Sequence, residues 1–417
     1  VSFYSKRRTA EKQLNNDKEI AIKAQQLAKE IQLKQKTAGN RLAVLPTEGN
    51  DAKAGGAPGE RTVGRYVKYA AGGAGIVFSE AVTVDYDGGR ARKNQLCLQE
   101  STAPEFAGLV QAVKKENPGV LFIIQLDHAG SLSDPAFTSV PSVYPKPGAE
   151  LLKDVGIVEI RDMFVRGIRA AYSAGADGVD LKFSHGFFLN ELVHPANTRQ
   201  GKYGGTFENR TRFLTELVDR IKNDVPLDRF LLGMRISAWE GTPGGSGTAG
   251  PQEVIEDLSE TLDFARLGER LGMAFISVSA GNALGNLEIL LPNPGNFTTV
   301  YKHFGWQKTV KAAVGIPVVG AGYSTLGRGD TPMPGNSAEK KSLLYWAEKN
   351  IADGVTDIVG LGRQAIADPS FPAKLLDGRL DEINFCQICG GCGALLGENK
   401  NIGCVRYDDY YRELSKS

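Results

Sequence analysis

The sequence predicts an α/β protein built on a (β/α)8 TIM barrel. Eight short apolar segments recur along the chain and alternate with segments whose apolar residues follow helical spacing. Continuous apolar strands of this kind occur in parallel sheets covered by helices, and eight strand–helix units close into a barrel. The chain also contains 50 glycines among 417 residues, which fits a fold with many tight turns between strands and helices.

The predicted elements divide the chain into three parts. Residues 1–37 form an arm, with a solvated helix over residues 10–36; residues 38–380 form the barrel; residues 381–417 form a cysteine-rich extension. The predicted strands cover residues 40–46, 75–81, 120–126, 178–181, 231–237, 275–279, 316–320 and 357–363. Helical patterns between them include residues 105–116, 162–174, 213–223 and 338–353.

Composition excludes several classes of partner. The chain has 49 basic and 48 acidic residues, so its net charge of +1 gives no electrostatic reason to bind nucleic acid or a membrane surface. No apolar run is long enough to span a bilayer. Residues 1–8 contain no apolar signal core, so we expect a cytoplasmic protein.

The fourth strand carries the first candidate site. Lys182 and His185 lie at its carboxyl end, where barrel enzymes place their catalytic groups. This strand, the step from His185 to Gly186 and the segment from Lys202 to Phe213 (KYGGTFENRTRF) together resemble the old yellow enzyme family. The resemblance extends over roughly residues 38–405 and implies a flavin-dependent oxidoreductase on a (β/α)8 barrel.

The resemblance also implies an FMN site at the strand ends. Gln125 would hydrogen-bond the pyrimidine edge of the flavin, and Arg235 would lie near N1 and O2, where its charge stabilises the reduced ring. Backbone groups after the seventh and eighth strands would hold the phosphate. The cofactor-binding residues implied are Pro46, Thr47, Ala81, Gln125, Arg235, Gly320, Ala321, Gly322, Gly362 and Arg363. No separate dinucleotide-binding fingerprint is present.

The same family match assigns catalytic roles to Lys182 and His185. Two donors at these positions would hold the carbonyl oxygen of an enone, enoate or enoyl thioester while hydride arrives at the β-carbon. The alternative for Lys182 is an ion pair with a nearby acid that only shapes the pocket. Phe187 stands where the family usually has a proton-donating tyrosine. Tyr144, Tyr203 or solvent could donate instead, or the reaction could be an oxidation or an isomerisation that needs no such donor.

The cysteines suggest a metal centre. Cys386, Cys389, Cys392 and Cys404 have the spacing C-x2-C-x2-C-x11-C, which fits zinc or an iron–sulfur cluster. The spacing resembles the [4Fe–4S] site of the subfamily that contains 2,4-dienoyl-CoA reductase, 2-enoate reductases and trimethylamine dehydrogenase. A zinc knuckle or a loop without metal remains open. Cys97, alone in the barrel, is interpreted as a structural thiol.

The reaction predicted is hydride transfer from reduced FMN to a C=C bond activated by a carbonyl or carboxylate, with NAD(P)H as the electron donor. The subfamily members carry a further domain for FAD and NAD(P)H, and because this sequence stops at Ser417 we expect the chain to work without one. Electrons would then come directly from NAD(P)H, from a partner protein or from the substrate. Flavin-dependent oxidation or isomerisation, a non-catalytic flavin or cluster subunit, and assembly into a homo-oligomer stay open.

Overall fold

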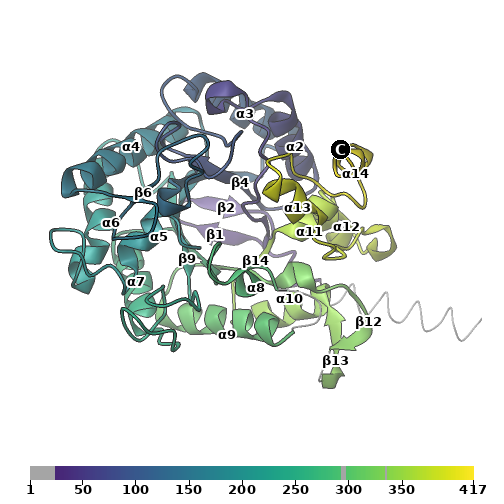
Figure 1. Cartoon of the computed structure of the whole chain (residues 1–417). Helices are drawn as coiled ribbons and strands as arrows, with labels where there is room; N and C mark the ends of the chain where they lie inside the picture. The colour runs from purple at the N-terminus through teal and green to yellow at the C-terminus, as the bar shows by residue number, and fades with distance from the viewer. Residues whose placement is uncertain (1–23, 293–296, 334–335) are drawn as a thin grey trace, which may run out of the picture.

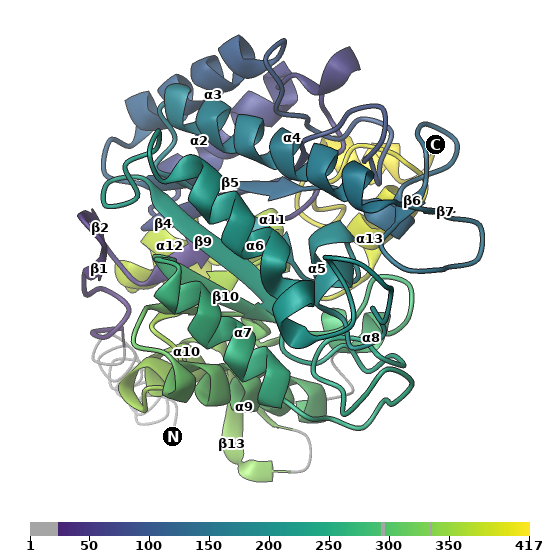
Figure 2. The ribbon, with the colours of Figure 1, turned by 90° about the vertical axis from the view of Figure 1, so that its left-hand side faces the viewer.

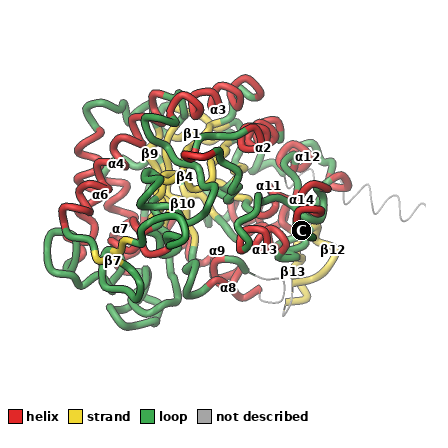
Figure 3. The backbone as a smooth tube through the Cα atoms, turned by 45° about the horizontal axis from the view of Figure 1, so that its top comes forward, coloured by secondary structure: helices red, strands yellow, loops and turns green. Residues whose placement is uncertain are grey.

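The central element is a closed barrel of eight parallel strands, which confirms the predicted fold class. The computed structural model describes residues 24–292, 297–333 and 336–417. In spatial order the barrel strands are β3 (Leu42–Val44), β4 (Ile76–Thr83), β5 (Leu121–Asp127), β8 (Gly178–Phe183), β9 (Leu231–Ser237), β10 (Phe275–Ser279), β11 (Val318–Gly320) and β14 (Ile358–Leu361). Figures 1 and 3 show these strands enclosed by helices.

The helices form the outer layer. The longer ones are α2 (Glu60–Ala71), α3 (Ala103–Glu116), α4 (Asp154–Ser173), α6 (Phe207–Ile221), α7 (Ser259–Arg270), α9 (Phe297–Ala313) and α10 (Leu343–Ala352). Short helices α5 (Phe188–Val193), α8 (Leu287–Leu290), α11 (Arg363–Ala367) and α12 (Phe371–Leu376) lie in the connections. Within the described residues, no helix combines the length and apolar character needed to cross a membrane.

Apolar side chains fill two layers. One cluster lies inside the barrel, where Phe78 and Phe275 pack edge to face with ring centroids 5.5 Å apart. A larger cluster lies between the strands and the helices, and its fully buried members include Phe164, Phe188 and Phe213. Because both faces of each strand are covered, the strands read as continuous apolar segments, which is why the sequence revealed them.

The helix predicted over residues 10–36 is wrong in its described part. Ile31–Leu33 (β1) and Lys36–Ala38 (β2) form an antiparallel hairpin, and residues 10–23 of the prediction lie outside the described residues. Ile31, Leu33 and Ala38 join the apolar cluster inside the barrel. Buried and exposed residues therefore alternate along β1, as in a strand, and do not follow a helical spacing. The hairpin covers the end of the barrel opposite α5, α8 and α13 (Figure 2).

The helix predicted over residues 338–353 begins later than expected. The described residues there form a second hairpin from Arg328–Met333 (β12) and Asn336–Ser342 (β13), and α10 starts at Leu343. The Ser342 side chain accepts a hydrogen bond from the Tyr345 backbone N–H, which fixes the start of the helix as an N-cap. The capping serine, rather than the apolar pattern alone, marks this boundary.

The remaining short elements lie in the connections between strands and helices and in the C-terminal extension. They are η1 (Ala54–Gly56), η2 (Gly130–Leu132), β6 (Pro141–Ser142), β7 (Glu150–Leu151), η3 (Tyr323–Thr325), η4 (Leu380–Glu382), α13 (Gly391–Gly397) and α14 (Asp409–Leu414). The extension with α13 and α14 packs beside α2, α11 and α12 (Figure 1). Its backbone is tied to the segment after β3, because Ile402 N–H donates to the Gly49 carbonyl at 3.0 Å.

Candidate active site

An open cavity lies at the carboxyl ends of the barrel strands. It encloses about 640 Å³ including the space open to solvent. Eight of the residues predicted for the cofactor or for catalysis line it: Pro46, Thr47, His185, Arg235, Ala321, Gly322, Gly362 and Arg363. The cavity therefore brings together residues from five strand ends that are far apart in the sequence.

Arg235 forms the charged wall of this cavity. Its side chain leaves β9, and its guanidinium donates to Ser277 Oγ at 3.1 Å and to Ser279 Oγ at 3.2 Å on β10. Burial lowers the pKa of the guanidinium, although the Asp180 carboxylate acts in the opposite direction. A buried cation that makes its hydrogen bonds to the hydroxyl groups of Ser277 and Ser279 is well suited to stabilise an anionic ring in the cavity.

Gln125 and Asp180 form a second polar layer below Arg235. Gln125 Nε2 donates to Asp180 Oδ2 at 2.6 Å, and the other carboxyl oxygen of Asp180 is buried without a hydrogen-bond partner. Burial raises the pKa of Asp180 to about 7. The unsatisfied oxygen indicates that a further donor belongs next to this layer.

The seventh and eighth strand ends supply a closely packed backbone. Gly322 has a φ of +95°, and a Cβ there would come within 3.2 Å of His303 Cβ. Gly320 does not line the cavity, because its own position packs against Gln307. Arg363 donates to the Pro292 carbonyl at 3.0 Å and reaches the cavity wall. At Gly322, Gly362 and Arg363 the cavity therefore reaches the ends of both strands.

His185 lies at the cavity mouth in a strained backbone conformation. Its φ is +66°, and its N–H donates to Ser237 Oγ at 2.9 Å. The Nε2 atom is 2.7 Å from Ser279 Oγ. Burial, and then the charges of Arg235 and Lys182, hold the His185 pKa well below its usual range. The imidazole is therefore neutral, and it can donate one hydrogen bond to a ligand without adding a charge.

Lys182 does not line the cavity. Its ammonium is 3.4 Å from Asp127 Oδ2 and 3.1 Å from the centroid of the Phe187 ring. This geometry matches the alternative considered from the sequence, in which Lys182 pairs with an acid. Ala81 lies outside the cavity as well, where its carbonyl accepts from Gln95 Nε2 at 3.0 Å.

Neither tyrosine considered as a proton donor lines the cavity. Tyr203 donates to Glu216 Oε2 on α6 at 2.7 Å, in the outer layer. The Tyr144 hydroxyl is 2.9 Å from His194 Nδ1. If the reaction is a reduction, the proton must come from solvent or from a residue that the sequence analysis did not single out.

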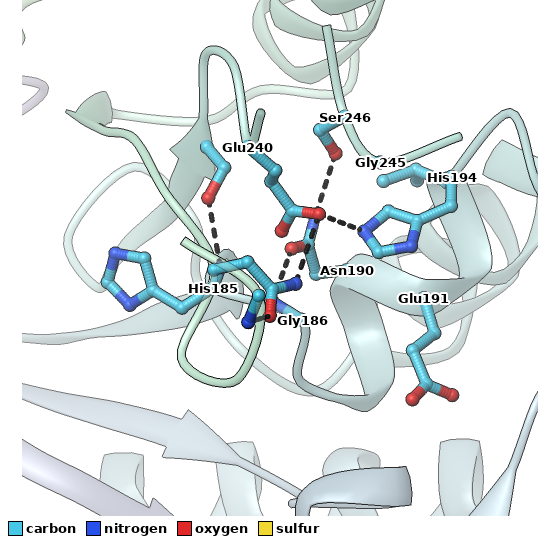
Figure 4. Close-up of polar contacts among 12 residues, drawn as sticks. His185, Gly186, Asn190, Glu191, His194, Glu240, Gly245 and Ser246 are labelled. Atoms are coloured by element: carbon cyan, nitrogen blue, oxygen red, sulfur yellow. Dashed lines mark hydrogen bonds and ion pairs between the residues drawn. The ribbon is translucent and has the colours of Figure 1, made fainter. Parts of the chain in front are cut away.

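A buried polar network that the sequence analysis missed supports the segment after β8. His194 Nε2 is 2.9 Å from Glu240 Oε2, and Asn190 Nδ2 donates to Ser246 Oγ at 2.8 Å. In Figure 4 the rings of His185 and His194 lie on opposite sides of Glu240. The network joins α5 to the segment after β9, so it holds the backbone of His185 in place. The one sequence signal was the charged residue Glu240, three residues after the end of the fifth predicted strand.

The structure gathers the four cysteines of the extension near the cavity. Cys386, Cys389, Cys392 and Cys404 are all free thiols. Burial is the main cause that raises the pKa of Cys386 and of Cys392, and further thiols of the set add to it. Among the described residues, no three cysteine, histidine or carboxylate side chains lie close enough to share a single metal ion.

Arg363 links the two regions. It lines the cavity, and burial lowers the pKa of its guanidinium. The Cys386 and Cys392 thiols act electrostatically on the guanidinium in the opposite direction. The Cys386 N–H donates to Gln364 Oε1 at 2.8 Å, which docks the extension onto α11. Arg363 therefore lies close both to the cavity and to the Cys386 and Cys392 thiols.

Comparisons with known proteins agree with this architecture. A model of the "NADH:flavin oxidoreductase / NADH oxidase family" matches residues 26–323. NADH oxidase of Thermoanaerobacter brockii is 32% identical over 384 residues, which cover 88% of this chain and 53% of that protein. The chain thus spans about half the length of this curated relative.

Two solved structures have the same fold. A 2-naphthoyl-CoA reductase superposes with a TM-score of 0.76 at 23% identity and covers 93% of this chain and 58% of its own. Histamine dehydrogenase from Rhizobium sp. 4-9 superposes with a TM-score of 0.74 at 22% identity, covering 94% and 53%. With the family match over most of the barrel, the lining of the cavity and these likenesses, the chain belongs to the NADH:flavin oxidoreductase / NADH oxidase family.

Proposed function

We propose that the chain is an FMN-dependent oxidoreductase that takes hydride from NAD(P)H and transfers it to a C=C bond activated by a carbonyl or carboxylate group. The observation that carries this proposal is the cavity wall formed by His185 and Arg235, which meet at Ser279. A neutral donor and a fixed cation there suit a neutral substrate oxygen above an anionic reduced ring.

The residues present fit FMN. The unpartnered Asp180 oxygen and the serine-bound Arg235 each leave a place for a group that the chain does not supply. Pro46, Thr47, Ala321, Gly322, Gly362 and Arg363 would surround it, with Gln125 and Arg235 toward its pyrimidine edge. When bound, FMN supplies the hydride. His185 would hold the substrate oxygen, and its neutrality lets it donate a hydrogen bond as negative charge develops there.

The first test is the identity of the bound flavin. Protein released by heat should yield one FMN per chain by chromatography. FAD, or no flavin after reconstitution, contradicts the assignment. NAD(P)H should then reduce the bound flavin under anaerobic conditions, and an enone, enoate or enoyl thioester should reoxidise it.

We also propose that the four cysteines hold a [4Fe–4S] cluster. A cubane cluster keeps its four thiolates farther apart than a single ion does, because each thiolate binds a different iron. The spacing C-x2-C-x2-C-x11-C supports a cluster, and the thiols lie near enough to one another to act on each other electrostatically. Anaerobic protein should contain close to four irons and four sulfides per chain. Stoichiometric zinc without sulfide rejects the cluster.

A second candidate function is oxidation, for example of an amine. Histamine dehydrogenase shares the fold, and Phe187 offers no proton for a reduction. In that case the substrate itself would reduce the flavin, and a cluster would pass electrons to a partner protein. Anaerobic mixing with amines distinguishes the two: bleaching of the flavin by an amine, with no response to NAD(P)H, favours oxidation.

A further inference from the structure

Ser279 is a cavity-lining serine to which the function above assigns no role of its own. Its side chain lies between the two polar groups of the cavity wall. Arg235 Nη2 donates to Ser279 Oγ at 3.2 Å, and His185 Nε2 lies 2.7 Å from the same oxygen. The direction of the hydrogen bond between Ser279 and His185 decides what His185 offers to a ligand, because the imidazole is neutral and carries only one N–H group.

The contact with Arg235 settles that direction. A hydroxyl group carries one proton and can accept two hydrogen bonds, whereas an arginine side chain only donates. Arg235 therefore occupies an acceptor site of Ser279 and leaves the serine proton free. In the part of the chain that the structure describes, His185 Nε2 is the one further partner of this buried hydroxyl. The serine proton is satisfied when it points to Nε2, and Nε2 then carries no proton.

The imidazole proton of His185 consequently resides on Nδ1, since the bond made by one ring nitrogen selects the tautomer. Burial, and then the charges of Arg235 and Lys182, keep the ring neutral by holding its pKa well below the usual range. Within the described segments no residue binds Nδ1, and the half-buried ring lines the cavity. The Nδ1–H group is thus available to a molecule in the cavity.

Neighbouring barrel strands hold this arrangement in place. Ser279 on β10 stands opposite Ser237 on β9 in the register of the barrel. Ser237 Oγ accepts from the backbone N–H of His185 at 2.9 Å. The backbone of His185 is therefore fixed by one serine and its ring by the other, and both serines lie on rigid strands.

We propose that Ser279 is a positioning residue of this site, which holds His185 in the tautomer with its proton on Nδ1 so that Nδ1–H donates to the substrate oxygen. This inference rests on the function proposed above. In the opposite tautomer the Nδ1 lone pair would face that oxygen and repel it.

The proposed tautomer also connects the substrate oxygen to a charge. Arg235, Ser279 and His185 form a chain in which every hydrogen bond points toward the substrate, and the bonds of such a chain polarise one another. The positive charge of Arg235 thereby strengthens a neutral donor as negative charge grows on the substrate oxygen. No proton moves along the chain.

The first test reads the tautomer without turnover. The chain contains four histidines, so ¹⁵N-labelled imidazoles can be resolved by NMR in flavin-free protein, and His185→Asn identifies the signals of His185. Wild type should show a protonated Nδ1 and an unprotonated Nε2. Ser279→Ala should lose this pattern, and Ser279→Thr, which keeps the hydroxyl, should retain it. The matched control is Ser277→Ala, which removes the other hydroxyl bound to Arg235, at 3.1 Å, and should leave the tautomer unchanged.

The second test shows whether Ser279 acts through His185. In anaerobic stopped-flow experiments, Ser279→Ala should slow reoxidation of the flavin by an enone about 10–100-fold, the range known for partners that orient metal-binding imidazoles. Ser279→Thr should restore most of this rate, and flavin reduction by NADPH should change little. In the His185→Ala background, Ser279→Ala should cost less than about threefold more, because residues that act as a unit are not additive.

The outcomes separate this inference from the proposed function. Wild-type protein that reduces alkenes with hydride from NAD(P)H while carrying the His185 proton on Nε2 overturns the role of Ser279 alone. Equal rate losses from Ser279→Ala in the wild-type and His185→Ala backgrounds overturn it as well. Wild-type protein that neither accepts hydride from NAD(P)H nor reduces alkenes contradicts the proposed function. The substrate contact of Nδ1–H then falls with it, while the NMR spectrum still decides whether Ser279 sets the tautomer.

Discussion

Replacing His185 tests the proposed substrate contact most sharply. His185→Ala removes a donor that would face the substrate oxygen while leaving Arg235 in place. Removal of one oxyanion donor costs about 3–4 kcal/mol at the transition state, which corresponds to a rate loss of about 10²–10³. Reoxidation of the flavin by an enone should therefore slow by that factor, whereas its reduction by NADPH should change little.

The backbone at His185 requires a second variant. Its φ of +66° lies in the left-handed region, where every residue with a Cβ, including the native histidine, bears a cost of roughly 1–2 kcal/mol. Asparagine tolerates this conformation better than alanine and keeps a neutral N–H donor on a shorter side chain. His185→Asn should therefore be at least as stable as His185→Ala, and it should lose less of the reoxidation rate. Substrate-dependent reoxidation that is unchanged in both variants would refute the pocket assignment.

Three further predictions concern stability, FMN and the cysteines. Burial lowers the pKa of His303 to about 4 from an ordinary 6.5, so its contribution to stability is complete above pH 6.5 and disappears as pH falls to about 4; the unfolding free energy of wild type relative to His303→Gln should drop by roughly 3 kcal/mol over that range. Gly322→Ala and Gly354→Ala both place alanine at positive φ, and each should lose about 1–2 kcal/mol of stability, but only Gly322→Ala should weaken FMN binding measured by fluorescence quenching. Cys389→Ser should abolish bound iron and sulfide, whereas Cys97→Ser, which replaces a buried thiol with a pKa raised to about 12, should retain both.

The sequence predicted the barrel because its strands are covered on both faces and therefore stand out as apolar runs. It also located most of the cavity, since Arg235, His185 and Gly322 all lie within or just after such strands. The two hairpins escaped prediction for a local reason. The β1 strand has only three residues, and Ser342 ends one hairpin and caps the following helix.

The ion pair of Lys182 could not be predicted from the chain alone. Asp127 and Lys182 lie on β5 and β8, and only the pairing of these strands brings them together. For the same reason the sequence could not decide that Lys182 pairs with Asp127 instead of lining the cavity. Tyr203 illustrates the opposite error, because a conspicuous tyrosine near the site faces Glu216 in the outer layer.

One anaerobic stopped-flow experiment tests the central claim most directly. Protein reconstituted with FMN is mixed first with NADPH or NADH and then with an enone, and the flavin absorbance is followed in both steps. The account predicts bleaching by the nicotinamide and full recovery of oxidised flavin by the enone, with the saturated ketone as product. A flavin that NADPH and NADH leave oxidised, or a reduced flavin that no activated alkene reoxidises, would contradict it.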